Sequence, residues 1–212
     1  MIHPPLRGRR LRHIVMMLLF DAVVLWLLFS WQYLDVLFSG EERPLAPLTN
    51  AVMVILAVLA ALALTLRIPP AWKDAIVLGR VRDGFCARRA FSELARNDYR
   101  YPIEALEHRL GPLPEAPEEQ LALWDGLYRT YADVPMIRQM HRQYLLCYEI
   151  AAVSLLLAVP MLVPVSIRWT TQQVVLAGPL YLLGQYAMFV VATRFMGDNL
   201  VQAVLAIEAT RA

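Results

Sequence analysis

The chain has 212 residues, of which 58% are hydrophobic and 18% charged, and its formal net charge at pH 7 is +2. So apolar a composition lies outside the usual range of soluble domains and is typical of polytopic membrane proteins. The small net charge gives no reason to expect a nucleic-acid partner, and this class of function is excluded from the interpretation.

Four long apolar runs follow one another along the chain. They cover residues 14–38, 49–68, 147–167 and 174–193. At a rise of 1.5 Å per residue, each run is about long enough to cross a hydrocarbon core of ~30 Å. The sequence therefore predicts an all-α polytopic membrane protein with four transmembrane helices.

Basic residues are distributed unevenly around these runs. Four arginines precede the first run, and twelve basic residues lie between positions 67 and 142. The two remaining connections contain only Arg43 and Arg168. Under the positive-inside rule, the arginine-rich segments face the cytoplasm. We therefore expect a multi-pass protein of the inner (plasma) membrane with both termini cytoplasmic.

This topology divides the chain into five parts. They are a basic cytosolic N-terminus (1–13), a first transmembrane hairpin (14–68), a cytosolic helical domain inserted between helices 2 and 3 (69–146), a second hairpin (147–193) and an amphipathic cytosolic tail helix (194–212). The tail helix is expected either on the membrane surface or packed on the central domain. Its polar face lacks the basic residues of an interfacial helix, which favours packing.

Proline and glycine positions predict the helices of the central domain. One helix is expected over 71–97, a short one over 103–110, and a third that begins at Pro117. From Pro135 the helical pattern continues without interruption into the third apolar run. The third membrane helix is therefore expected to project into the cytosol as a stalk.

Asp21 lies about seven residues into the first apolar run. A charge at the centre of a bilayer costs ~2.5 to 3.5 kcal/mol on insertion scales, so the side chain is expected to face protein or water. It has two interpretations, a neutral or paired aspartate that fastens helices together, or a group with an ion- or proton-linked function. The intramembrane polar residues expected to accompany it are Thr65, Gln185, Tyr186 and Arg194.

Residues that bend transmembrane helices occur in the third and fourth runs. Such bends are common at gates and also occur in inert membrane helices. The candidate gate residues are Pro160, Pro164, Gly178, Pro179 and Gly184.

The densest basic region lies in the central segment. It suits an anionic ligand or anionic lipid headgroups, attracted by ~1 kcal/mol per basic residue. The alternative is an ordinary solvated face, because the same segment contains eleven carboxylates between positions 74 and 133. The candidate contact residues are Arg80, Arg82, Arg88, Arg89, Arg96 and Arg100.

No enzymatic motif is recognisable, so we expect no enzyme, no catalytic or metal site and no cofactor. Residues 83–88 match part of the metal-binding signature of CDP-alcohol phosphotransferases. The other carboxylates of that signature are missing, and the match is attributed to chance. Glu104, His108 and His141 are the only residues to nominate for a metal, and we interpret these histidines as surface or subunit-contact residues.

Two membrane hairpins around a soluble domain offer a way to convert a cytosolic event into a rearrangement of membrane helices. The first functional hypothesis is an oligomeric channel or membrane-permeabilising effector gated through its cytosolic domain. In outline the arrangement resembles the small multi-span effectors of bacterial abortive-infection systems, which would imply antiviral defence. Its partners would be the bilayer, further copies of the chain, and a cytosolic protein or small anionic ligand. The alternative is a non-conducting scaffold or accessory subunit of an inner-membrane complex.

Overall fold

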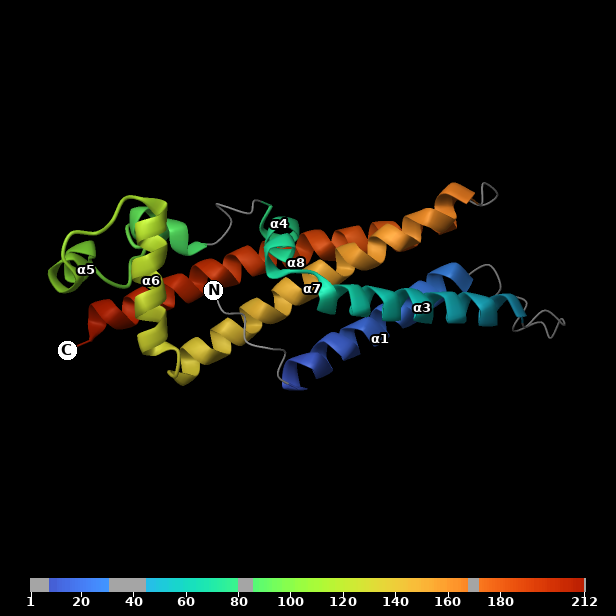
Figure 1. Ribbon diagram of the computed structural model, residues 1–212, viewed down its shortest axis with the longest axis horizontal. Coiled ribbons are helices and arrows are strands. Elements are labelled where there is room, and N and C mark those ends of the chain that lie inside the picture. Colours follow the sequence, from blue (N-terminus) through green and yellow to red (C-terminus); the bar gives the residue numbers. More distant parts are fainter. Residues whose placement is uncertain (1–7, 31–44, 80–85, 168–171, 212) are drawn as a thin grey trace. The chain divides into compact units, whose positions relative to one another are not determined.

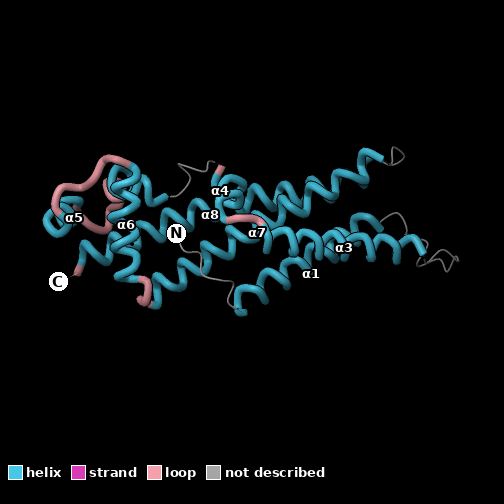
Figure 2. The backbone as a smooth tube through the Cα atoms, in the orientation of Figure 1, coloured by secondary structure: helices cyan, strands magenta, loops and turns pink. Residues whose placement is uncertain are grey.

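The computed structural model describes residues 8–30, 45–79, 86–167 and 172–211 (Figure 1). Across these ranges the regular secondary structure is helical, and no strand occurs in them (Figure 2). The prediction of an all-helical protein is confirmed for this part of the chain.

The chain forms two compact units, each built from two separate stretches of sequence. Unit 1 consists of Met1–Lys73 and Tyr148–Phe189, and unit 2 of Asp74–Cys147 and Val190–Ala212. Two long helices, α7 (Pro135–Ile167) and α8 (Gln172–Thr210), each supply residues to both units.

Unit 1 contains α1 (Gly8–Ser30) and α3 (Leu45–Arg67), which pack along each other (Figure 1). Its core combines large aliphatic side chains with alanines, and small residues allow helices in apolar bundles to approach closely. The buried residues of this core are Leu25, Val54, Ala61, Leu157, Ala158 and Leu182.

Unit 1 also exposes many large apolar side chains. Soluble monomers rarely expose large contiguous apolar patches, so apolar side chains exposed in this number favour contact with lipid or protein. On α1 and α3 these residues include Met16, Leu19, Phe20, Val23, Val52, Met53, Ile55, Leu56 and Leu59.

Two helical stretches are long and apolar enough to cross a membrane, namely Pro135–Val159 in α7 and Leu176–Thr210 in α8. In each stretch we consider a predominantly apolar segment of 18 residues, of which 61% is buried in α7 and only 28% in α8. Packing against the other described residues therefore does not explain why this part of α8 is apolar. Another apolar stretch, Ala51–Thr65, is shorter, and the expected first crossing extends into residues 31–38, outside the described residues.

Unit 2 surrounds one hydrophobic core. A 3-10 turn (η2, Cys86–Arg89) leads into a π-helical turn (η3, Ala90–Leu94), followed by α5 (Ile103–Leu110) and α6 (Pro117–Tyr131). These elements pack with the first turns of α7 and the C-terminal part of α8 (Figure 1). The largest fully buried side chains of this core are Trp124, Phe91, Leu106, Ile137, Leu200 and Leu205.

Helices α5 and α6 lie where the sequence predicts them. Pro102 precedes α5 in an extended conformation, and Gly111 follows it with φ of 79°. Glycine adopts positive φ without the strain that a Cβ would bring, so it ends the helix. Pro117 opens α6, where its missing N–H and preset φ are no disadvantage.

The prediction of a single helix over 71–97 is wrong. Instead, α4 (Pro70–Leu78) ends before Gly79, whose φ of 81° takes the backbone out of the right-handed helical region. The chain is next described at Cys86, in the 3-10 and π-helical turns. Repeating apolar residues predicted a regular helix because periodicity does not register the backbone break at Gly79.

The tail is not a separate helix. Gly197 lies inside α8, which continues unbroken from Gln172 to Thr210. Of the two placements considered, the structure shows packing on the central domain, because Leu200, Val204 and Leu205 are buried in the core of unit 2. The expected continuation of the central domain into the third apolar run is confirmed, since α7 is one helix from Pro135 to Ile167.

Candidate functional site

A buried polar cluster in unit 1 joins α1 to α8. The Tyr181 hydroxyl donates a hydrogen bond to Asp21 Oδ1 at 2.9 Å, and Gln185 Nε2 donates to Asp21 Oδ2 at 3.2 Å. Asp21 is 2% exposed and Gln185 6% exposed. We call these three residues the Asp21 cluster.

The structure brings only part of the predicted intramembrane set together. Asp21 and Gln185 are in contact, whereas the Thr65 hydroxyl donates within α3 to the Ala61 carbonyl at 2.7 Å. Arg194 belongs to unit 2, where its Nη2 donates to the Leu78 carbonyl at 3.2 Å. Tyr186, next to Gln185 on α8, is half-buried.

Sequence reasoning missed Tyr181 as the second partner of Asp21. A signal was available, because Tyr181 lies four residues before Gln185 and shares its helix face. That rule identifies the pair once Gln185 is chosen, but nothing in the sequence selects the helix that Asp21 faces.

A second pair in unit 1 also escaped the sequence analysis. Lys73 Nζ lies 2.8 Å from Glu149 Oε2, and the two side chains are 11% and 16% exposed. Lys73 is the only lysine of the chain, and Glu149 is the only carboxylate in the third apolar run. Both side chains are largely buried, and a buried charge is costly unless an opposite charge lies beside it.

The candidate gate residues lie within continuous helices. Pro160 and Pro164 are in α7, but their side chains lie outside the described residues. Gly178 and Pro179 are buried in α8, which passes through Pro179 without a break. Gly184 is exposed, and a Cβ there would meet no atom within 4 Å. A role in gating remains a prediction for all five.

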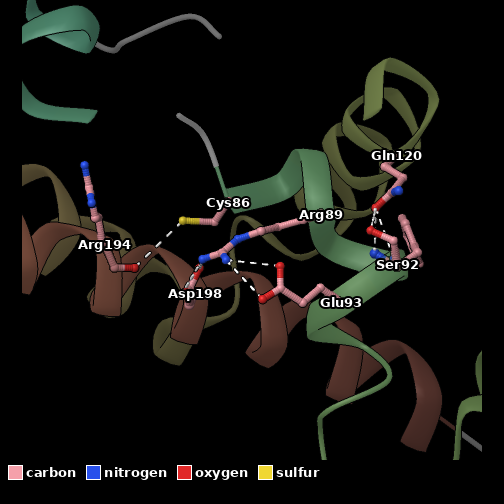
Figure 3. A network of polar contacts seen from close by, with 8 residues as sticks. Cys86, Arg89, Ser92, Glu93, Gln120, Arg194 and Asp198 are labelled. Carbon is pink, nitrogen blue, oxygen red and sulfur yellow. Dashed lines mark hydrogen bonds and ion pairs between the residues drawn. The ribbon is translucent and has the colours of Figure 1, made fainter. Parts of the chain in front are cut away.

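Two arginines of the predicted basic region form ion pairs with carboxylates of the same chain. Arg89 Nη2 donates to both carboxylate oxygens of Asp198 at 2.9 Å, while Nη1 contacts Glu93 (Figure 3). Arg100 Nε donates to Asp98 Oδ1 at 2.8 Å. Arg88 is half-buried and Arg96 is exposed, whereas Arg80 and Arg82, like the motif residues 83–85, lie outside the described residues.

Cys86 lies beside α8 in the same network, with its Sγ 3.8 Å from the Arg194 carbonyl oxygen (Figure 3). Burial, reinforced by the carboxylate of Asp198, raises the pKa of the thiol to about 12. At neutral pH Cys86 is therefore a protonated, unreactive thiol. A Cβ on Gly197 would lie 2.7 Å from Cys86 Sγ, so the close approach of η2 and α8 requires glycine there.

Gln120 supports the irregular backbone of η2 and η3 from α6. Its Oε1 accepts hydrogen bonds from the backbone N–H groups of Phe91 at 3.0 Å and Ser92 at 3.2 Å (Figure 3). Its Nε2 donates to the Glu115 carbonyl at 2.9 Å. The side chain is 1% exposed. This one amide satisfies backbone donors that a regular helix would pair internally.

Polar contacts of Glu208 bind the C-terminal end of α8 to its neighbours in unit 2. The buried Glu208 accepts a hydrogen bond of 2.6 Å from the Tyr131 hydroxyl and lies 3.2 Å from Arg109 Nε. Arg109 also donates to the backbone carbonyl of Arg211. Burial and the neighbouring Glu208 carboxylate raise the pKa of Tyr131, which keeps the phenol protonated as donor. Glu208 thus ties α8 to α5 and α6.

Replacing Asp98 with asparagine is expected to lower stability in a pH-dependent way. Burial acts to raise the pKa of Asp98, but the hydrogen bonds and charge of Arg100 outweigh it and hold the pKa below its ordinary value. The stabilisation is therefore complete above the unfolded pKa of about 3.9 and is lost as pH falls through the lower folded pKa. Because Arg100 is partly exposed, we expect about 1 kcal/mol at pH 7.

Thermal melting of the wild type and Asp98→Asn at pH 7 and at about pH 2 measures this difference. The gap in melting temperature should close at the lower pH. Asp133→Asn is the matched control, because the Asp133 side chain is fully exposed. A gap of equal size at both pH values would contradict the assignment.

Residues nominated for a metal are not assembled into a site. Among the described residues no group of three or more His, Cys, Asp or Glu side chains is placed to hold an ion. Glu104 and His108 are exposed on α5, while the ring of His141 on α7 is near those of Tyr128 and Tyr144, with centroid distances of 5.4 and 6.4 Å.

Comparison with known proteins adds no relative, because no protein-family model, curated protein or solved structure matches the chain. The described residues of the chain are all-helical in their regular structure. Two of these helices are long and apolar enough to cross a membrane.

Proposed function

We propose that the chain is an oligomeric channel or membrane-permeabilising effector of the inner membrane, gated through its helical domain. In this proposal four helices cross the bilayer, unit 2 is cytosolic and both termini face the cytoplasm. The observation that supports it best is that α7 and α8 each contribute to the core of unit 2 and also contain a stretch apolar enough to span. A change in unit 2 therefore acts on the same helices that would cross the membrane.

Two further features support a place in the bilayer. Large apolar side chains are exposed on α1, α3 and α8, where lipid would cover them. The Asp21 cluster also supplies hydrogen bonds to a carboxyl group that would otherwise be costly in an apolar environment. Four helices enclose little water, so a conducting pore requires several copies.

The alternative, a non-conducting scaffold or accessory subunit, is favoured by one observation. Arg89 and Arg100, two of the six arginines expected to receive an anionic ligand, are paired with Asp198 and Asp98 of the same chain. Because these two arginines are neutralised within unit 2, the basic region attracts an anionic ligand less strongly.

Reconstitution separates the two functions. The protein is purified in detergent, its assembly mass is measured, and ion flux is recorded from vesicles with and without cytosolic extract. The proposal predicts a homo-oligomer that conducts ions. A chain that needs a stoichiometric partner for stability and conducts nothing would reject the channel and favour the scaffold.

Coupling through α8 is tested by Glu208→Gln, which keeps the side-chain shape but removes the charge beside Arg109. If the end of α8 transmits the state of unit 2, flux should change by about tenfold, because weakening a charge-assisted hydrogen bond costs ~1.5 kcal/mol and about 1.4 kcal/mol changes an equilibrium constant tenfold. Glu107→Gln on α5 is the matched control, because Glu107 is exposed. Equal flux from both variants and the wild type would contradict coupling through this contact.

A further inference from the structure

The Asp21 carboxyl is held by hydrogen-bond donors on both of its oxygens. The hydroxyl of Tyr181 and the amide Nε2 of Gln185 approach it from α8, four residues apart. A carboxylate only accepts hydrogen bonds, so this arrangement suits the ionised form. Neither donor carries a charge.

Both partners are able to hold the protonated form as well. Gln185 Oε1 is buried and has no hydrogen-bond partner among the described residues. Rotation of the amide about its last torsion exchanges Nε2 for Oε1, which then accepts the proton of a carboxylic acid at Asp21. The Tyr181 hydroxyl also has lone pairs for accepting a hydrogen bond. Neutral Asp21 therefore keeps both partners, and Gln185 Oε1 takes the place of Nε2 in the hydrogen bond to Asp21.

No fixed counter-charge is seen to lock Asp21 in its ionised state. The two side chains that hydrogen-bond to it in the described part of unit 1, Tyr181 and Gln185, are both uncharged. Helix α3 has no ionisable residue before Arg67, and the carboxylate of α7, Glu149, is paired with Lys73. A carboxylate bound to arginine or lysine is kept charged, whereas one bound by neutral groups is free to exchange its proton.

We propose that Asp21, Tyr181 and Gln185 form a proton-binding site. A hydronium ion transfers its proton to Asp21 Oδ2 and leaves as water, and Gln185 turns so that its Oε1 accepts a hydrogen bond from the new O–H group. The site thereby takes up one proton between α1 and α8, and the hydrogen bonds that join the two helices are kept in both protonation states. This inference rests on the proposed function for its place in a membrane channel and adds a proton as the ion that the site binds.

Asp21→Asn separates proton binding from packing. The asparagine oxygen accepts from Tyr181, and its nitrogen donates to Gln185 Oε1, so both contacts survive while proton uptake is abolished. The measurement is infrared difference spectroscopy of the full chain in lipid, recorded as pH is lowered from about 9 to about 4. The wild type should gain a carboxylic-acid carbonyl band that Asp21→Asn lacks, and the control Asp133→Asn should retain it.

Identical difference spectra for the wild type and Asp21→Asn would overturn the proposal. If Asp21→Asn does not fold, Gln185→Met supplies a second test, because it removes the amide with little change of volume. Its carbonyl band should shift in frequency as the acid loses an acceptor, and an unshifted band would also overturn the proposal. Failure of the channel is distinguishable, since a pH-dependent Asp21 band without ion flux keeps this site and rejects conduction.

Discussion

Replacing Lys73 with methionine is expected to destabilise unit 1 by about 3 kcal/mol, because it leaves Glu149 without its partner in a largely buried position. Leaving one charge of a buried pair uncompensated costs more than the pair itself contributes. For a chain of this size, the loss corresponds to a fall in melting temperature on the order of 10 °C. Circular dichroism of the purified protein in detergent measures it.

The double variant Lys73→Met and Glu149→Leu provides the control. With both charges replaced by apolar groups of similar volume, most of the stability should return, since no unpaired charge remains. The double variant is therefore expected to melt above either single variant. If the losses of the two single variants simply add, Lys73 and Glu149 do not act as a pair.

Replacing Trp124 with alanine is expected to destabilise unit 2 by about 3 to 5 kcal/mol. The indole is 1% exposed in the core of this unit, and its ring stacks on Tyr128 with centroids 5.2 Å apart. Removing it leaves a cavity among η2, η3, α6 and α8 that the neighbouring helices fill only in part. Loss of the helical signal during thermal melting measures the effect.

Trp72→Ala is the matched control for this experiment. The same atoms are removed, but Trp72 is 68% exposed and belongs to unit 1. Little hydrophobic burial is lost there, so the melting temperature should change far less. Equal losses in the two variants would show that Trp124 is not the centre of the core.

Both sets of variants also bear on the coupling proposed through α7 and α8. Glu149 lies on the part of α7 that belongs to unit 1, whereas Trp124 packs in unit 2. If the shared helices transmit changes, a defect in either unit should alter ion flux in vesicles. Ion flux that responds to Lys73→Met but not to Glu208→Gln would place control of the pore in unit 1 alone.

Local chemistry made two helices of the central domain, α5 and α6, predictable. The limits of α5 and α6 follow from Pro102, Gly111 and Pro117, because each residue acts on the backbone at its own position. The interruption after Leu78 was not predictable in the same way. Glycine is compatible with a helix as well as with positive φ, and at Gly79 the surrounding structure selects the latter.

In the candidate site, too, the sequence identified some residues but not the contacts between them. Asp21 and Gln185 stand out in the sequence because polar groups in apolar runs are costly, yet their contact joins residues 164 positions apart. Apolar periodicity shows that a helix is buried, but it does not identify its neighbour. Asp198 as the partner of Arg89, Lys73 as the partner of Glu149 and Arg109 as the partner of Glu208 were not predictable for this reason, since each pair is far apart in the sequence.

The sequence by itself determined the helical class, the apolar runs and the ends of α5 and α6, because these depend on composition and on interactions within a few residues. Only the tertiary structure decided that Tyr181 completes the Asp21 cluster, that Lys73 pairs with Glu149 and that the end of α8 packs in unit 2. Such pairings are set by which helix faces meet, and that is a property of the packed chain rather than of any segment.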